Sequence, residues 1–215
     1  MEVLELKPIK DKNCKINIIE KTECKLSKQE TKELDNFLKN HKINVITIDS
    51  SKIEQLSLRK TPMGKYFEKY KIPFIGVNIP EFAMGYLEME IAEKKEQIEE
   101  LEKEFISINN KDSFKAQNLE SWIFLLKKEL IQKLNILEFK VKPQWFVKQI
   151  LDIIKNCKES SISILHFSAH KHISELEKLF RELQIKTITN KLASMESNKS
   201  LDHENKFIKS AQIIN

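Results

Sequence analysis

Glycine is scarce in this chain of 215 residues, which contains only Gly64, Gly76 and Gly85. A dinucleotide-binding loop of the G-x-G-x-x-G type needs closely spaced glycines, and a P-loop needs a glycine directly before Lys-Ser or Lys-Thr. Neither pattern occurs in the sequence. Glycine-rich loops for nucleotide phosphates are therefore excluded. The three glycines nevertheless gather within residues 64–85, and a glycine inside a strand often marks a close approach of another backbone or a ligand.

Cysteines and long apolar runs are also scarce. The three cysteines, Cys14, Cys24 and Cys157, form no C-x-x-C pair. Their odd number excludes a disulfide framework or a four-cysteine zinc site within one chain, so we expect reduced thiols. No apolar run approaches the ~20 residues that cross a bilayer, and residues 1–12 lack the apolar core of a signal peptide. We therefore expect a soluble, cytoplasmic protein without membrane contact.

Neither sign of charge dominates, because 37 basic residues face 32 acidic ones and leave a net charge of +5. This excess is small for a nucleic-acid-binding domain, and the sequence has no basic stripe interleaved with aromatic residues, so we expect no nucleic-acid partner. The charges are unevenly placed. Eight Glu and three Lys give residues 86–108 a net charge of −5, and seven Lys with four acidic residues give residues 111–142 a net charge of +3.

Short apolar segments alternate with amphipathic segments over most of the chain. Apolar or β-branched runs predict five strands, at residues 15–19, 43–49, 73–80, 162–167 and 185–189. Helices are expected between them. Ser27 and Glu30 form a capping box for one helix, and Thr61-Pro62 is the start of another. Strands that alternate with helices predict an α/β fold with a parallel or mostly parallel, Rossmann-like sheet.

Residues 80–157 differ from the rest because their pattern is almost entirely helical. Apolar residues spaced by three and four form one seam, which only Lys94 interrupts: Met84, Leu87, Ile91, Ile98, Leu101, Phe105 and Ile108. After a polar break at 109–113 comes a second seam: Leu119, Ile123, Leu126, Leu130 and Leu137. A break this short makes the helices antiparallel neighbours, and their opposite charges favour that pairing. We expect a long, coiled-coil-like helical hairpin inserted between the third and fourth strands, with Pro143 beginning a further helix.

These patterns divide the chain into four parts. Residues 1–80 and 158–189 are the two halves of an α/β domain, and residues 81–157 contain the hairpin and the helix after it. Residues 190–215 form a polar tail, whose composition predicts mobility. The end of the tail, at 207–214, is more apolar, and both fraying and docking on the body or on a partner remain open.

Polar side chains gather where three of the predicted strands end. Asp49 ends the second strand, Asn78 lies near the end of the third with Glu81 just beyond, and His166 lies near the end of the fourth with His170 just beyond. Ligands of parallel sheets bind beyond the carboxyl ends of the strands, so these residues are the candidate site. Three of them also have a structural interpretation. Asp49 caps the following helix, His166 is a core histidine on an apolar face, and His170 is a surface residue.

Two functions of different classes fit these patterns. The first is an interaction or scaffold protein, whose α/β body presents the charged hairpin to a protein partner or to a second copy through residues 84–137. The heptad seam supports this function, although packing of the hairpin on itself explains the seam better than a coiled coil with a second subunit.

The alternative is a hydrolase that acts on a phosphoester or a nucleotide. Asp49, His166 and His170 would serve as acid and base or would hold a divalent metal. Arg59 and Lys65, from a basic loop that we expect at the same edge, would bind the anion together with the polar residues after the third strand. No motif in the sequence identifies a resident metal site or a cofactor.

Overall fold

The computed structural model describes residues 6, 9, 12–21, 23–49, 55–190 and 192. It contains a single five-stranded sheet in the order β3-β2-β4-β1-β5, and every neighbouring pair is parallel. The strands are β1 (Asn13–Glu20), β2 (Val45–Asp49), β3 (Phe74–Val77), β4 (Ser161–Ser168) and β5 (Lys186–Asn190). The parallel α/β fold predicted from the sequence is confirmed. The predicted tail at 190–215 lies almost wholly outside the described residues.

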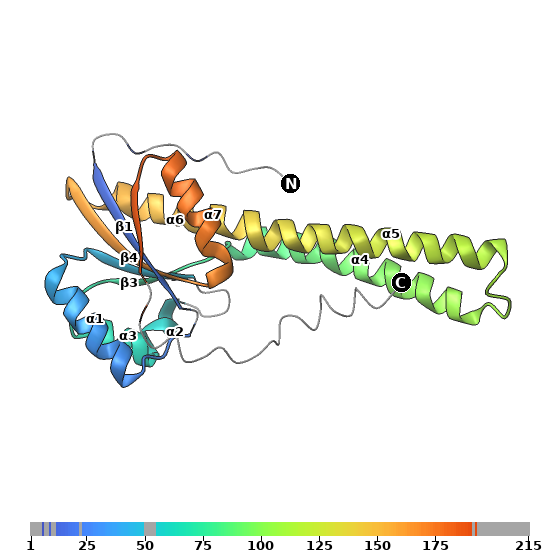
Figure 1. Ribbon diagram of the computed structural model, residues 1–215, viewed down its shortest axis with the longest axis horizontal. Coiled ribbons are helices and arrows are strands. Elements are labelled where there is room, and N and C mark those ends of the chain that lie inside the picture. Colours follow the sequence, from blue (N-terminus) through green and yellow to red (C-terminus); the bar gives the residue numbers. More distant parts are fainter. Residues whose placement is uncertain are drawn as a thin grey trace.

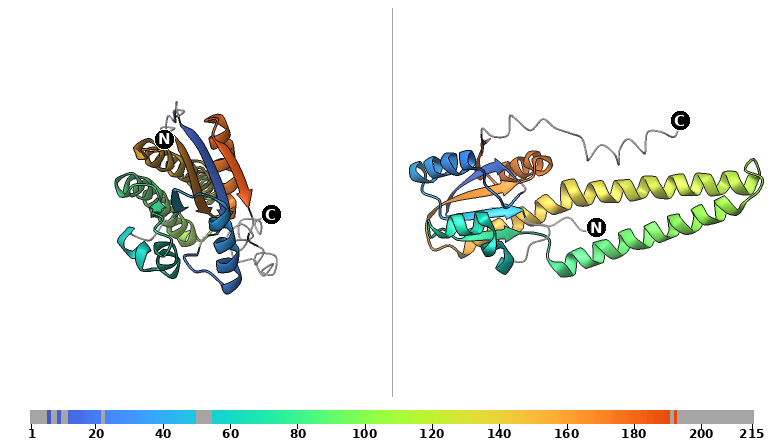
Figure 2. Two further views of the ribbon diagram at one scale, coloured as in Figure 1. Left: turned by 90° about the vertical axis from the view of Figure 1, so that its left-hand side faces the viewer. Right: turned by 90° about the horizontal axis from the view of Figure 1, so that it is seen from below.

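Helices cover both faces of the sheet and make three layers (Figures 1 and 2). The chain moves in one direction across the sheet from β1 to β3, and in the opposite direction from β3 to β5. Right-handed crossovers therefore place the helices of the two halves on opposite faces. One face carries α1 (Lys28–Asn40), α2 (Gln55–Lys60) and α3 (Pro62–Glu68), and the other carries α6 (Lys142–Asn156) and α7 (His170–Glu182).

Strand β4 shows how the two halves of the core are separated. Ile162 and Ile164 pack in the cluster under α6 and α7, whereas Leu165 and Phe167 pack in the cluster under α1 and α3. Side chains alternate between the two faces of a strand. His166 therefore shares the face that α6 and α7 cover, and it is completely buried there.

The predicted helix starts at Ser27 and Thr61 are confirmed. Ser27 and Glu30 make both hydrogen bonds of a capping box, and the side chain of Glu30 also pairs with the buried Lys21 at 2.8 Å. The Thr61 hydroxyl accepts a hydrogen bond from the amide of Gly64. In both places the cap satisfies a backbone donor that the first helical turn leaves unpaired.

Two long antiparallel helices, α4 (Glu81–Ser107) and α5 (Phe114–Ile136), extend away from the α/β body (Figures 1 and 2). Residues 81–136 are called the arm below. Ile98 of α4 and Ile123 of α5 are buried, and Leu87 of α4 is buried at the root of the arm, where it packs with Ile79 and Leu137. Ion pairs cross between the helices, joining Lys94 to Glu129, Lys115 to Glu104, Lys127 to Glu102 and Lys133 to Glu90. No helix of the described residues is both long enough and apolar enough to cross a membrane.

Helix α5 continues into α6 through a π-helical turn, η1 (Leu137–Val141). Proline has no N–H to donate, and its ring collides with the carbonyl four residues earlier. Pro143 lies just after this turn, and a π turn widens the helix so that the chain passes this conflict without a break. The sequence predicts a separate helix at Pro143. The structure shows α6 beginning at Lys142, directly after the π turn. Helix α5, the π turn and α6 therefore form one continuous helical segment that joins the arm to the helix layer.

We predict that Gly64→Ala destabilises the protein by about 2 kcal/mol, because overpacking a filled site costs this much. An added Cβ would lie 2.3 Å from the Leu58 carbonyl oxygen and 2.9 Å from the Arg59 Cα. Gly85→Ala is the matched control, since a Cβ there meets nothing within 4 Å. It should stabilise α4 by about 0.5–1 kcal/mol. Urea denaturation of both variants measures the difference, and equal effects would contradict the packing of α2 on α3.

Candidate functional site

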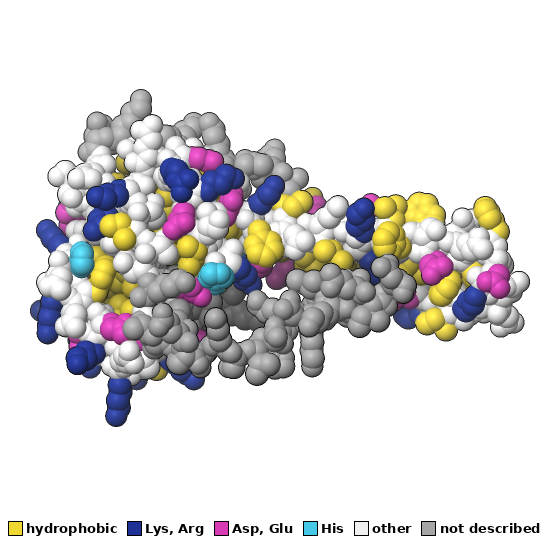
Figure 3. All heavy atoms as spheres, in the orientation of Figure 1, with side chains coloured by type: hydrophobic (Ala, Val, Ile, Leu, Met, Phe, Trp, Pro, Cys, Tyr) yellow, Lys and Arg dark blue, Asp and Glu magenta, His cyan; other side chains and the backbone are white. Residues whose placement is uncertain are grey.

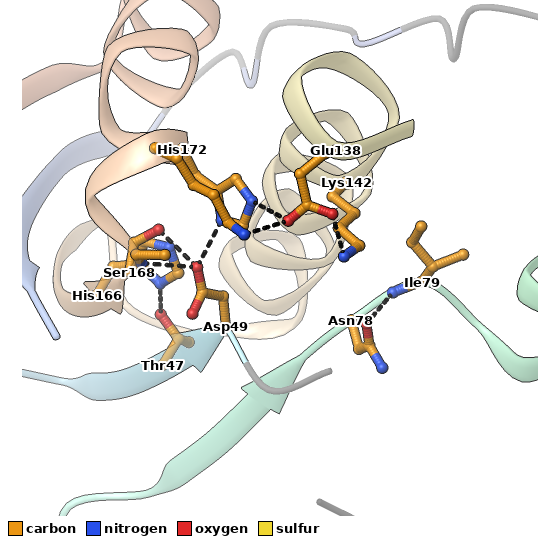
Figure 4. Close-up of polar contacts among 11 residues, drawn as sticks. Thr47, Asp49, Asn78, Ile79, Glu138, Lys142, His166, Ser168 and His172 are labelled. Carbon is orange, nitrogen blue, oxygen red and sulfur yellow. Dashed lines mark hydrogen bonds and ion pairs between the residues drawn. The ribbon is translucent and has the colours of Figure 1, made fainter. Parts of the chain in front are cut away.

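The carboxylate of Asp49, at the carboxyl end of β2, is the centre of a buried polar cluster (Figure 4). Its Oδ2 atom accepts hydrogen bonds from the Ser168 hydroxyl at 2.7 Å, the Ala169 amide at 3.0 Å and Nδ1 of His172 at 2.9 Å. Burial alone would raise the pKa of Asp49, but these hydrogen bonds, His172 first, outweigh it and hold the pKa below its ordinary value. Asp49 therefore stays ionised and ties β2 to the start of α7.

His172, in the first turn of α7, lies between two carboxylates. Its Nδ1 faces Asp49, and its Nε2 lies 3.2 Å from Oε1 of Glu138, a residue of η1 (Figure 4). Two acceptors on opposite sides of one ring require a proton on each nitrogen. Burial would lower the pKa of His172, but the hydrogen bonds from the ring to Asp49 and Glu138 raise it above the ordinary value. The geometry and the raised pKa both favour the imidazolium form of the ring.

Glu138 is the outer member of this cluster. It accepts a hydrogen bond from His172 and pairs with Lys171 at 2.9 Å and with Lys142. The hydrogen bond from His172 is the largest of the effects that place its pKa well below the usual range. Glu138 comes from the root of the arm, so the chain of contacts runs from the end of β2, through α7, to the point where the arm joins the body.

His166 lies on the face of the sheet that α6 and α7 cover, but its protonation state differs from that of His172. Its Nδ1 lies 2.9 Å from the Thr47 hydroxyl, and no described residue bonds to its Nε2. Complete burial lowers the pKa of His166 to about 4, so the ring is neutral at physiological pH. The structure thus places His166 in the core beside Asp49, in agreement with its interpretation as a core histidine.

The other candidate residues are spread over separate places. His170 is exposed, and its ring lies 3.1 Å from Glu20 at the end of β1. The side chain of Asn78 accepts a hydrogen bond from the Ile79 amide. Glu81 is the exposed first residue of α4. None of these three makes a hydrogen bond or ion pair with Asp49 among the described residues.

The basic candidates Arg59 and Lys65 are exposed on α2 and α3. Arg59 lines a cavity of about 380 Å³ together with Pro73 and Phe74. These two residues lie at the amino end of β3, whereas Asp49 pairs with Val77 at the carboxyl end. The structure therefore does not bring the guanidinium of Arg59 to the edge of the sheet that Asp49 occupies.

Sequence reasoning missed Ser168, His172 and Glu138 as members of this cluster. Ser168 and His172 follow the predicted fourth strand, so their proximity to Asp49 was within reach of the same rule that selected His166. Glu138 is 34 residues from His172 and lies in a segment whose pattern is simply helical. No sequence signal places its carboxylate at the carboxyl edge of the sheet.

The charged side chains of this cluster are too buried to be accessible to a substrate. His172 and Asp49 have only 5% and 6% of their side chains exposed. Among the residues that the structure describes, no group of three or more His, Cys, Asp or Glu side chains is arranged to hold a metal ion. The geometry therefore supports a buried charge network that connects three elements.

Comparison with protein-family models, with curated proteins and with solved structures found no match to this chain. The function is therefore argued from the chain's own residues.

We predict that His172→Gln lowers the free energy of unfolding by about 3 kcal/mol, because removing the cation leaves the buried carboxylate of Asp49 without its charged partner. His170→Gln is the matched control. His170 has 79% of its side chain exposed, and a surface substitution of this kind changes stability by less than about 0.5 kcal/mol. Urea denaturation at pH 6 compares the two variants with the wild type, and equal effects would contradict the buried network.

The contribution of His172 to the free energy of unfolding should decrease as the pH rises. A raised pKa in the folded protein means that the folded state binds the proton more tightly than the unfolded chain, whose histidine titrates near 6.5. The contribution is therefore complete below about pH 6.5 and is lost as pH rises through the folded-state pKa. We expect the stability gap between wild type and His172→Gln to narrow between pH 6 and pH 9 in urea titrations. A constant gap would show that folding does not raise the pKa of His172.

Proposed function

We propose that this protein is an interaction protein, in which the arm is a helical hairpin inserted between β3 and β4 and presented by the α/β body to a protein partner. One observation carries the proposal. All twelve of the exposed large hydrophobic side chains among the described residues lie between Phe82 and Phe139, in the arm and the π turn at its root. Figure 3 shows hydrophobic side chains along the arm in that view. Contiguous exposed apolar surface is typical of protein–protein interaction sites.

Helix α5 has more apolar surface than α4 covers. Its inner residue Ile123 is buried, while its neighbours Trp122 and Phe124 remain 60% and 68% exposed. Residues 122, 123 and 124 point to three different sides of a helix, because successive residues are about 100° apart. A helix that is apolar on all sides is normally buried. The surface that α4 leaves open on α5 is therefore suited to another polypeptide.

The α/β body supports the same proposal by contrast. Among its described residues no large hydrophobic side chain is strongly exposed, although its interior holds two extensive apolar clusters. Apolar exposure is thus confined to one structural unit, which favours a dedicated binding surface on the arm.

The hydrolase hypothesis receives no support from the described contacts. The Asp49 carboxylate is buried and already accepts three hydrogen bonds, and His166 is neutral and enclosed. Arg59, which would bind the anion, lies toward the other end of the sheet. The arm is therefore the better-supported functional surface.

The test places a photo-crosslinking amino acid at position 122 or 124 of the full chain, expressed in its native cells. The control position is Lys39, an exposed residue at the end of α1. We expect both arm positions to give one covalent adduct whose polypeptide is identified by mass spectrometry, and we expect position 39 to give none. A second variant, Ile131→Ser with Leu134→Ser, should reduce the adduct formed at position 124. Equal crosslinking from all three positions, or none, would contradict the proposal.

A further inference from the structure

The face of the α/β body that α1, α2 and α3 cover carries a surplus of positive charge. Among the described residues between 23 and 71, the only exposed carboxylates are those of Glu23 and Glu68, and Glu33 and Asp35 are half-buried. Ten basic side chains are exposed in the same segment, and together we call them the basic face: Lys25, Lys28, Lys32, Lys39, Lys42, Arg59, Lys60, Lys65, Lys69 and Lys71. The whole-chain excess of five charges, from which we expect no nucleic-acid partner, therefore averages over unlike surfaces.

The cations of the basic face differ from those elsewhere in having no carboxylate partner. No ion pair joins any of the ten to another residue that the structure describes. In contrast, four ion pairs cross the arm, and on the face that α6 and α7 cover Lys155 pairs with Asp152 and Lys178 pairs with Glu175. Like charges gathered on one surface repel one another. An external polyanion would relieve that repulsion.

A row of lysines along α1 is the most regular part of the basic face. Successive residues of a helix are about 100° apart, so Lys28, Lys32 and Lys39 point within about 40° of one another. They lie on the side of α1 away from the buried Leu34. The row is about 16 Å long, because each residue adds about 1.5 Å. Figure 3 shows dark blue side chains over the part of the body where Figure 1 places α1. Helix α1 therefore presents a straight line of positive charge.

Helix α3 lies beside α1 and continues this surface. Tyr66 of α3 and Tyr70 just after it both donate hydrogen bonds to the carboxylate of Asp35 on α1. These two hydrogen bonds are the main reason that the pKa of Asp35 is lowered, and the nearby ammonium groups of Lys39 and Lys69 lower it further. Lys39 of α1 and Lys69 of α3 therefore lie on either side of one carboxylate, and the positive surface extends from one helix to the other.

The surroundings of these cations favour one kind of polyanion. Helices that lie on membranes combine basic residues with exposed apolar ones, and proteins that bind single strands stack the bases on aromatic side chains. The described part of the α/β body has no strongly exposed side chain of either kind. Duplex nucleic acid needs neither, because its phosphates alone carry one charge per about 1.7 Å of helix axis. An extended acidic polypeptide carries at most one charge per about 3.3 Å, so the duplex attracts the row of lysines more strongly.

We propose that the basic face binds the phosphate backbone of duplex nucleic acid, with the lysine row of α1 and the adjoining lysines of α3 as its centre. Lysine contacts to phosphates carry no sequence information, so this binding is independent of base sequence. The basic face is separate from the apolar surface of the arm. The inference therefore adds a second binding surface to the one in the proposed function.

The experiment measures binding of the full chain to a fluorescent DNA duplex of about 20 base pairs by anisotropy, between about 50 and 200 mM NaCl. We expect micromolar affinity at the lowest salt and a slope of about −5 for log K against log salt, as about five neutralised phosphates would give. The triple variant Lys28→Gln, Lys32→Gln and Lys39→Gln should weaken binding by about 100-fold and reduce the slope by about 3.

The matched control is Lys155→Gln with Lys158→Gln and Lys178→Gln, which removes three exposed charges outside the basic face. Both triple variants lower the net charge equally, so only a local site separates them, and the control should bind as the wild type does. Circular dichroism establishes that both variants are folded.

Three outcomes would overturn the inference: no salt-dependent binding at the lowest salt, equal losses in the two triple variants, or dependence on the base sequence of the duplex. Polyglutamate and phosphatidylserine vesicles are measured in parallel, and tighter binding of either would assign the basic face to an acidic protein or to a membrane instead. Each of these results leaves the arm untouched. Crosslinking from positions 122 and 124 that persists without duplex binding would refute this inference and not the proposed function.

Discussion

A charged imidazole between two carboxylates connects the three parts of this molecule. His172 begins α7, Asp49 ends β2, and Glu138 lies in the π turn at the root of the arm. On the surface each of these contacts would contribute little to stability, but the side chains of His172 and Asp49 are almost completely buried. Removing one member would leave an uncompensated charge inside the protein. The position of the arm root relative to the sheet therefore depends on this pairing.

The continuity of α5, η1 and α6 extends that constraint to the arm. The inner face of α6 is buried against the sheet through Phe146, Val147 and Ile150, and the helix runs on into α5 without a loop. The π turn accommodates Pro143 and also turns Glu138 toward His172. The arm is thus fixed at its base by packing and by charge, so a partner docked on its apolar surface would be held in a defined direction relative to the body.

The features that the sequence alone predicts are those whose sequence signals act between residues close together in the chain. Period-two apolar runs and the capping residues Ser27 and Thr61 act within a few residues, and they predicted the parallel sheet and these helix starts. Asp49 and His166 were also placed near each other by the rule for strand ends. The contact between Glu138 and His172 joins residues on either side of α6 and β4, and it depends on how α6 packs on the sheet, which no local pattern encodes. Arg59 was expected at the same edge of the sheet as Asp49 but lies with residues at the amino end of β3. A basic residue near a predicted loop carries no information about which end of the sheet its side chain reaches.

The central claim is that His172 is a doubly protonated ring held between Asp49 and Glu138. Nitrogen-15 NMR of the histidine side chains tests it directly, because the shifts of both ring nitrogens distinguish an imidazolium from a neutral tautomer. We predict that His172 is mainly protonated at pH 6.5 and titrates above it, while the buried ring of His166, with a pKa lowered to about 4, stays neutral in the same spectra. A neutral His172 at pH 6.5, or one that titrates below that value, would contradict the claim.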